Sequence, residues 1–175
     1  MNKIVKLLMA SMMIVTVASS DINYRVGVGN ATINDLPSFS AYTIGMGIEG
    51  FSGKHLHSGF TFDMEFASLE ERGQKSLGTF AISTDYHLGY AFKHKFIPYA
   101  LVGLKIHRID GIDSSAIGFG YGAGVEYKFT PKWSVLTEYK TYSVKNYTTD
   151  FNYDSASTIF MIKYSFKPKK SEKQL

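Results

Sequence analysis

Charged side chains recur two residues apart along this sequence, in pairs such as Asp63 with Glu65 and Glu126 with Lys128. A two-residue spacing places both members of a pair on one face of an extended strand. Carboxylates such as Glu126 and Glu138 are the residue types that general acid–base catalysis or a proton path would use. The set that shares this face contains five cations and six anions: Arg25, Lys105, Lys128, Lys140 and Lys163, with Glu49, Asp63, Glu65, Asp85, Glu126 and Glu138.

These charges nearly cancel, which an enclosed interior requires because an unpaired buried charge is costly. We therefore predict an internal ion-pair network with a structural role. Two carboxylates in a filled interior lack the cleft that a substrate would need, so no catalytic residue is predicted. Antiparallel pairing about the connection at 93–96, with residue numbers summing to about 188–190, further predicts an ion pair between Asp85 and Lys105.

Two histidines, His55 and His57, have the i, i+2 spacing that places two metal ligands on one face of a strand. A metal site in a protein needs three or four ligands, and no third one is evident in the sequence. Both histidines also lie beside Lys54 in a predicted turn. We interpret them as solvated turn residues and predict neither a metal nor a cofactor.

Residues 118–123 match the loose nucleotide-binding fingerprint G-x-G-x-x-A. That fingerprint works only at a strand-to-helix turn, where backbone amides meet phosphate. Here glycine recurs at every second residue, which indicates the interior of a strand, so no nucleotide site is predicted. The chain has no cysteine, which excludes disulfides and thiol chemistry.

Hydrophobicity along the chain alternates with a period of two. This pattern indicates β-strands, which therefore position the charged residues. Residues 116–129 read AIGFGYGAGVEYKF, in which the odd positions are apolar and the even positions are small or charged. A strand of this length with these two faces can cross a membrane, where about 9–11 residues suffice. The small face predicts a narrow and crowded interior.

The same alternation recurs in eight segments, and it is weakest in the fifth and seventh, where leucines lie on the polar face. The segments are 22–29, 42–49, 60–67, 80–92, 99–107, 116–129, 133–140 and 159–166. Short connections alternate with longer polar ones, which is typical of periplasmic turns and external loops. The sequence therefore predicts an all-β fold: an eight-stranded antiparallel up-and-down transmembrane β-barrel over 21–166, with both mature termini periplasmic.

The N-terminus has the pattern of an export signal. Lys3 and Lys6 precede an apolar run at 7–17, and small residues at 18–20 allow cleavage before Asp21. This pattern predicts a signal peptide over 1–20, since the run is shorter than the ~20 residues that a membrane-spanning helix needs.

The C-terminal residues 167–175 hold four lysines and one glutamate, and we predict a disordered, basic periplasmic tail there. Residues 21–166 carry 13 basic and 14 acidic side chains. Because the basic character lies at the two ends, the pI of about 9.1 does not indicate a nucleic-acid partner.

Three segments resemble the OmpA/opacity-type outer-membrane β-barrel family: FIPYALVGLKI, GFGYGAGVEYKFTPKWSVLTEYKTY and the closing FMIKYSF. The resemblance covers essentially all of 21–166. It implies a place in the bacterial outer membrane, contact with outer-membrane lipid and lipopolysaccharide, and insertion by the outer-membrane assembly machinery. It also implies a non-enzymatic role in envelope integrity or surface interaction, with the periplasmic or surface partner unidentified. The external loops are shorter than an adhesin would need, and a basic tail follows the last aromatic residue, Phe166.

The sequence is compatible with two other functions. A lipid-modifying barrel enzyme would need serine, histidine and an acid together near the lipid-facing rim. The lipid-facing polar residues are chiefly Thr84 and Thr137, whereas His87 and His107 point inward by parity. A narrow channel for small solutes is the other alternative, although an eight-stranded barrel is only wide enough for its own side chains.

Overall fold

The computed structural model of the chain describes residues 20–34, 38–69, 77–93, 95–109, 115–145 and 152–166. The predicted signal peptide, apart from Ser20, and the predicted tail at 167–175 lie outside the described residues. Within the described ranges, no helix is both long enough and apolar enough to cross a membrane.

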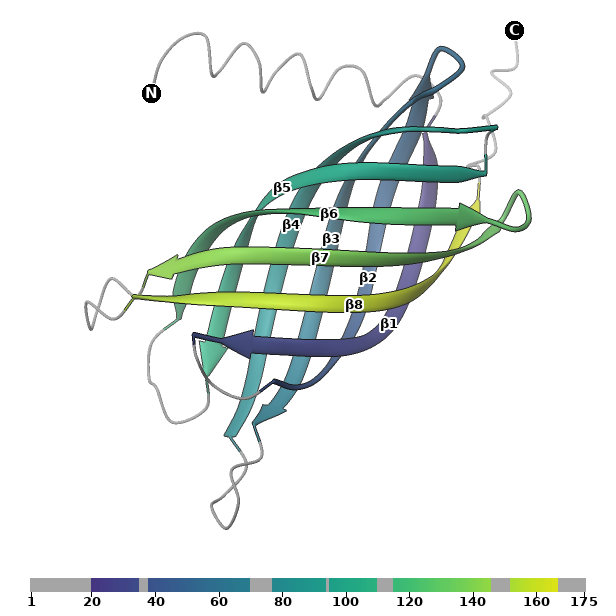
Figure 1. Ribbon diagram of the computed structural model, residues 1–175. Helices are drawn as coiled ribbons and strands as arrows, with labels where there is room; N and C mark the ends of the chain where they lie inside the picture. The colour runs from purple at the N-terminus through teal and green to yellow at the C-terminus, as the bar shows by residue number, and fades with distance from the viewer. Residues whose placement is uncertain are drawn as a thin grey trace, which may run out of the picture.

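Eight strands form one closed antiparallel barrel, which confirms the predicted fold class (Figure 1). Each strand pairs with its neighbours in sequence, and the last strand pairs back onto the first. The strands are β1 (Asp21–Ile33), β2 (Phe39–Ser52), β3 (Leu56–Leu69), β4 (Leu77–Tyr90), β5 (Phe96–Ile109), β6 (Ala116–Lys128), β7 (Trp133–Lys145) and β8 (Asn152–Phe166). Because closure pairs every strand on both sides, no open edge needs a partner.

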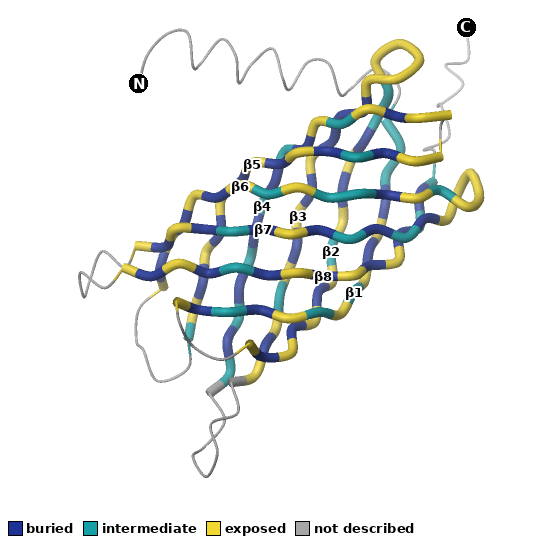
Figure 2. The backbone as a smooth tube through the Cα atoms, in the orientation of Figure 1, coloured by how far each residue is buried: buried dark blue, intermediate teal, exposed yellow. Residues whose placement is uncertain are grey.

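Buried and exposed residues alternate along the strands, as Figure 2 shows. The outward face carries large apolar side chains that are about half exposed, including Ile44, Val102, Phe119 and Tyr121. The inward face carries buried or half-buried glycines, most of the charged residues of the strands, and the three buried tyrosines Tyr99, Tyr142 and Tyr153. The predicted assignment of residues to the two faces is therefore confirmed for the described strands.

The two ends of the barrel differ. One end, called the terminal end below, holds the start of β1, the end of β8 and the short connections after β2, β4 and β6 (Figure 1). Aromatic side chains gather there in contact with one another, as in the ring pairs Tyr24–Phe166 and Trp133–Tyr164. Such rings favour the boundary between membrane and water. The opposite end, where the longer connections lie, is called the loop end.

The interior is more apolar toward the loop end than the alternating segments indicated. The inner faces of the strands there bury a cluster that includes Ile33, Phe39, Ala116, Val144 and Tyr153. The strands extend beyond the segments recognised in the sequence, and many of the additional inward positions are apolar, although Thr79, Ser155 and Ser157 are buried and polar. Apart from the ion pair of Lys105 with Glu65, the interior ion pairs lie in the middle and toward the terminal end.

Candidate functional site

Glycine makes room for the interior charges. Asp63 pairs with Gly45 on the neighbouring strand, Asp85 with Gly103, and Lys140 with Gly122. A Cβ atom added at Gly45 or Gly103 would run into the carboxylate of Asp63 or Asp85. The alternating glycines thus let long side chains from adjacent strands lean across the lumen.

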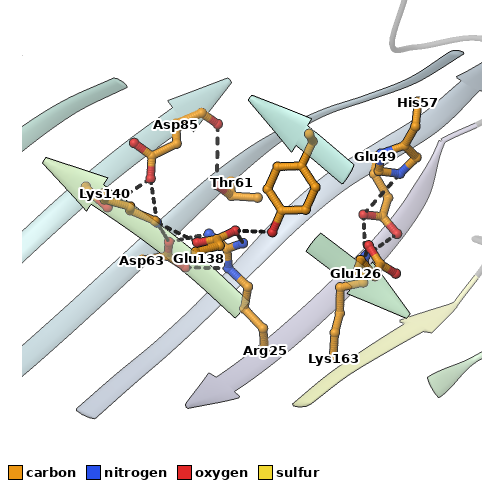
Figure 3. Close-up of polar contacts among 12 residues, drawn as sticks. Arg25, Glu49, His57, Thr61, Asp63, Asp85, Glu126, Glu138, Lys140 and Lys163 are labelled. Atoms are coloured by element: carbon orange, nitrogen blue, oxygen red, sulfur yellow. Dashed lines mark hydrogen bonds and ion pairs between the residues drawn. The ribbon is translucent and has the colours of Figure 1, made fainter. Parts of the chain in front are cut away.

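A cluster in the middle of the lumen, called the inner cluster, joins five charged residues from β1, β3, β4 and β7: Arg25, Asp63, Asp85, Glu138 and Lys140 (Figure 3). Arg25 donates through Nε to Asp63 at 2.6 Å and through a second nitrogen to the same carboxylate, and through Nη1 to Glu138 at 3.0 Å. Lys140 Nζ lies 2.9 Å from Asp63, 2.8 Å from Asp85 and 2.9 Å from Glu138.

Two buried tyrosines complete the inner cluster. The hydroxyl of Tyr99 donates to Glu138 at 2.7 Å, and the hydroxyl of Tyr142 donates to Asp85 at 2.5 Å. The cluster holds three carboxylates against two cations, so these neutral donors stabilise the charge that the cations leave unmatched. Neither tyrosine was singled out in the sequence, although continuing the period-two pattern through β5 and β7 places both on the inner face.

A second group of charges, called the terminal cluster, lies nearer the terminal end and comprises Glu49, Glu126, Lys128 and Lys163. Lys163 Nζ donates to both oxygens of Glu49, at 2.8 and 2.6 Å, and to Glu126 at 2.5 Å (Figure 3). Lys128 lies further out, 3.6 Å from Glu49 and 3.9 Å from Glu126, and keeps 16% of its side chain exposed. Two anions and two cations leave this cluster neutral.

The predicted pair of Asp85 with Lys105 is wrong, although the register behind it is correct. Asp85 lies opposite Gly103, within the predicted residue sum. Lys105 instead donates to Glu65 at 2.9 Å and to Ser155 at 3.3 Å, whereas Asp85 pairs with Lys140. Lys140 approaches from across the barrel, and the pairing of neighbouring strands does not reveal such a contact.

The arrangement leaves little space for a substrate or a continuous pore among the described residues. Two small interior cavities have volumes of about 10 Å³ each, which is roughly the room that a single water needs. Glu126 and Glu138, the carboxylates considered for acid–base chemistry, belong to different clusters, and each lies beside a lysine. The chemistry that this geometry supports is the mutual neutralisation of buried charges.

The structure corrects the interpretation of His57. It lies on β3 and is fully buried, not solvated in a turn, and its ring stacks on that of His87 with centroids 5.4 Å apart. His55 does lie in the exposed β2–β3 turn, as predicted. Residues 118–123 lie inside β6, where no helix follows to bind phosphate.

The lipid-facing surface of the described strands shows no grouping of serine and histidine. His57, His87 and His107 all point into the barrel and are buried. Thr84 donates to the backbone carbonyl of Thr61 at 3.4 Å, as part of the sheet. Along the described strands, a serine and a histidine therefore do not meet on the lipid-facing surface.

The fold and its two faces define a class of protein: a closed transmembrane barrel with an apolar outer surface and a charged, filled lumen. The family model described as the outer membrane protein beta-barrel domain matches residues 5–166. The chain belongs to this family and is a protein of the bacterial outer membrane. A search of the curated proteins found no match.

Solved structures with the same fold share little sequence with the chain. Neisserial surface protein A is 17% identical with a TM-score of 0.62, and the match covers 84% of this chain and 97% of that one. The attachment invasion locus protein Ail of Yersinia pestis is 12% identical, with a TM-score of 0.59 and coverage of 85% and 98%. The outer-membrane enzyme PagL is 14% identical, with a TM-score of 0.54 and coverage of 81% and 98%. At these identities the likeness establishes the fold alone.

Proposed function

We propose that the chain is a non-enzymatic outer-membrane barrel that serves envelope integrity or surface interaction. In this role its interior charges form a structural ion-pair network. The outward face contacts outer-membrane lipid and lipopolysaccharide, and the assembly machinery of that membrane inserts the barrel.

The observation that carries this proposal is how the interior is filled. Arg25, Lys140 and Lys163 each contact at least two carboxylates from other strands, and all three are buried. Removing one member of such a group leaves a buried charge without its partner, which destabilises a protein strongly. A lumen held together in this way supports a rigid scaffold more readily than a moving catalytic or conducting element.

Neighbours of the same fold include a neisserial surface protein, an attachment invasion locus protein and the outer-membrane enzyme PagL, so the fold does not decide between an enzyme and a non-enzymatic barrel. The non-enzymatic role is favoured because the described outward face lacks a serine and histidine that could act together on lipid. The channel alternative is disfavoured because cross-barrel ion pairs occupy the lumen at two levels.

A surface partner would meet the external connections, most of whose residues lie outside the described ranges. Ail of Yersinia pestis has been crystallised in complex with the heparin analogue sucrose octasulfate.

Three measurements on cells and purified protein test the proposal. Deletion of the gene should increase sensitivity to detergents and large antibiotics, and expression of the chain should restore resistance. Lipid A from cells with and without the protein should have the same mass. Purified barrel in planar bilayers should show no steady solute flux. A change in lipid A mass would establish the enzyme alternative, and reproducible unitary conductance would establish the channel.

A further inference from the structure

We propose that Glu49, His57 and His87 form a binding site for a divalent transition-metal ion, with Zn²⁺ as the expected occupant. The three side chains come from the adjacent strands β2, β3 and β4 and are all buried. Each offers one ligand atom, and these atoms lie within 4.8 Å of one another. The site shares Glu49 with the terminal cluster, but the proposal does not rest on the structural role proposed above.

The backbone register explains how three strands bring these groups together. Glu49 lies opposite Gly59 on β3, and Gly59 lies opposite His87 on β4. A Cβ atom at Gly59 would run into the His87 ring and come within 3.0 Å of the Glu49 Cβ atom. Glycine at this position therefore opens the space in which Glu49 and His87 approach each other, while His57 enters from two residues away on the same face of β3.

The polar atoms of His57 lack the partners that a buried imidazole normally has. Neither ring nitrogen makes a hydrogen bond to the described residues, and the residue is 0% exposed. Its Nε2 atom lies 3.5 Å from Glu49 Oε2, beyond a good hydrogen bond. Buried polar atoms without a partner are costly and call for an explanation, and an ion bound at one nitrogen supplies it.

The donor set selects the kind of metal. Two imidazoles and one carboxylate suit Zn²⁺ and similar ions, whereas Ca²⁺ and Mg²⁺ prefer oxygen ligands alone. With Zn–N and Zn–O distances of about 2.0–2.1 Å, ligand atoms in a tetrahedral site lie roughly 3.3 Å apart. In the structure His57 Nε2 lies 3.5 Å from Glu49 Oε2, and all three ligand atoms lie within 4.8 Å of one another, so small side-chain rotations would close the site around an ion.

A fourth ligand position has room for a water. Glu49, His87 and Asn23 all line a cavity of about 10 Å³. The polar atoms of Asn23 that matter here are those of its side-chain carboxamide. Both polar atoms of that carboxamide lack a hydrogen-bond partner among the described residues. A metal-bound water in this cavity would satisfy Asn23, which makes Asn23 a positioning residue for the site.

The charges around the site set a condition on binding. Lys163 Nζ donates to Glu49 Oε2 at 2.6 Å and to Glu126 Oε2 at 2.5 Å, and Lys128 Nζ lies 3.6 Å from Glu49 Oε1. An ion that takes one oxygen of Glu49 competes with Lys163, which then keeps its contact with Glu126. The site lies near the terminal end, so an ion from that side reaches it without crossing the inner cluster.

The decisive experiment measures metal bound to the untagged full chain, purified from membranes in detergent. Equilibrium dialysis against Zn²⁺ alone should give one ion per chain. His57→Asn and His87→Asn should abolish this binding, and His55→Asn, which changes the exposed turn histidine, should leave it intact. A heat-shift gel confirms that each variant is folded. A wild-type chain that binds no Zn²⁺, or folded His57→Asn and His87→Asn variants that still bind one ion, would overturn the proposal.

A second measurement needs no variant in the interior and covers the case in which those substitutions prevent folding. Cu²⁺ bound to the wild-type chain should show an electron paramagnetic resonance spectrum with two coordinated imidazole nitrogens. The same spectrum is expected from His55→Asn. A signal without imidazole nitrogens, or one that His55→Asn removes, would assign the ion to the surface and refute the buried site.

Discussion

Asp85 on β4 and Lys140 on β7 form an ion pair of 2.8 Å across the lumen, although two strands separate them in the sheet. Both are buried. Asp85→Asn and Lys140→Met should each lower the free energy of unfolding of the barrel. The double variant should lose less unfolding free energy than the two single variants lose together. We expect a coupling free energy of about 1–3 kcal/mol, measured by a double-mutant cycle on denaturant unfolding in detergent.

The control for this cycle combines Asp85→Asn with Lys163→Met. Lys163 belongs to the terminal cluster, where it pairs with Glu49 and Glu126, whereas Asp85 pairs with Lys140 in the inner cluster. The two effects should add within about 0.5 kcal/mol. Additive behaviour of the Asp85 and Lys140 pair would contradict the interaction across the lumen.

Arg25 tests whether the inner cluster needs a guanidinium or only a positive charge. Its planar group binds Asp63 through two nitrogens and reaches Glu138 through a third contact. Arg25→Lys keeps the charge and loses the fork geometry, so we expect it to cost about 1–3 kcal/mol of unfolding free energy. Arg25→Met removes the charge as well and should cost about 3–5 kcal/mol. If wild type and Arg25→Lys were equally stable in urea titrations, the fork geometry of the guanidinium would be unimportant in the inner cluster.

Gly120 on β6 tests how tightly the lumen is filled. A Cβ atom at this position would contact the Tyr142 ring, with Cγ at 2.7 Å, and the backbone oxygen of Thr141. Gly120→Ala should therefore destabilise the barrel by about 1–3 kcal/mol through overpacking. The matched control is Gly53→Asn in the β2–β3 turn, where φ is +66° and nothing lies within 4 Å of an added Cβ. Asparagine tolerates that conformation, so the control should be nearly neutral. If Gly120→Ala were equally neutral, the interior would not be crowded.

Val102 on β5 tests the lipid-facing surface. It lies midway along its strand, opposite Tyr121, and is 48% exposed on the outer face. Val102→Arg should cost about 2–4 kcal/mol in lipid bilayers, since a cation then lies near the bilayer midplane. Val102→Leu keeps the apolar character and should fold like wild type. Unfolding in liposomes compares the two variants, and a harmless Val102→Arg would show that this face does not meet lipid.

Alternation with a period of two was enough to assign residues to faces. The pattern GFGYGAGVEYK on β6 has the same parity in the sequence and in the barrel, because successive strand side chains must point to opposite sides. The short connections also set the register of neighbouring strands, as the pairing of Asp85 with Gly103 shows. Both properties are local, so they can be predicted from the order of residues.

Contacts across the lumen are not local. Lys140 meets Asp85, and Lys163 meets Glu49 and Glu126, only after β8 closes onto β1 and the inner faces turn toward one another. The tilt and stagger of the closed sheet determine which inward positions stand at the same level, and no pattern within one strand contains that information. The surroundings of His57 could not be predicted from one strand either, because its neighbours Glu49 and His87 come from the two adjacent strands.

The sequence alone thus determined the strand count, the membrane-facing surface and the inward position of the charges, since these follow from periodicity and chain connectivity. Only the tertiary structure decided which charges pair, where Tyr99 and Tyr142 donate, and that three metal-ligand side chains converge near the terminal end. The physical reason is that these contacts depend on the stagger of a closed barrel, which all eight strands set together.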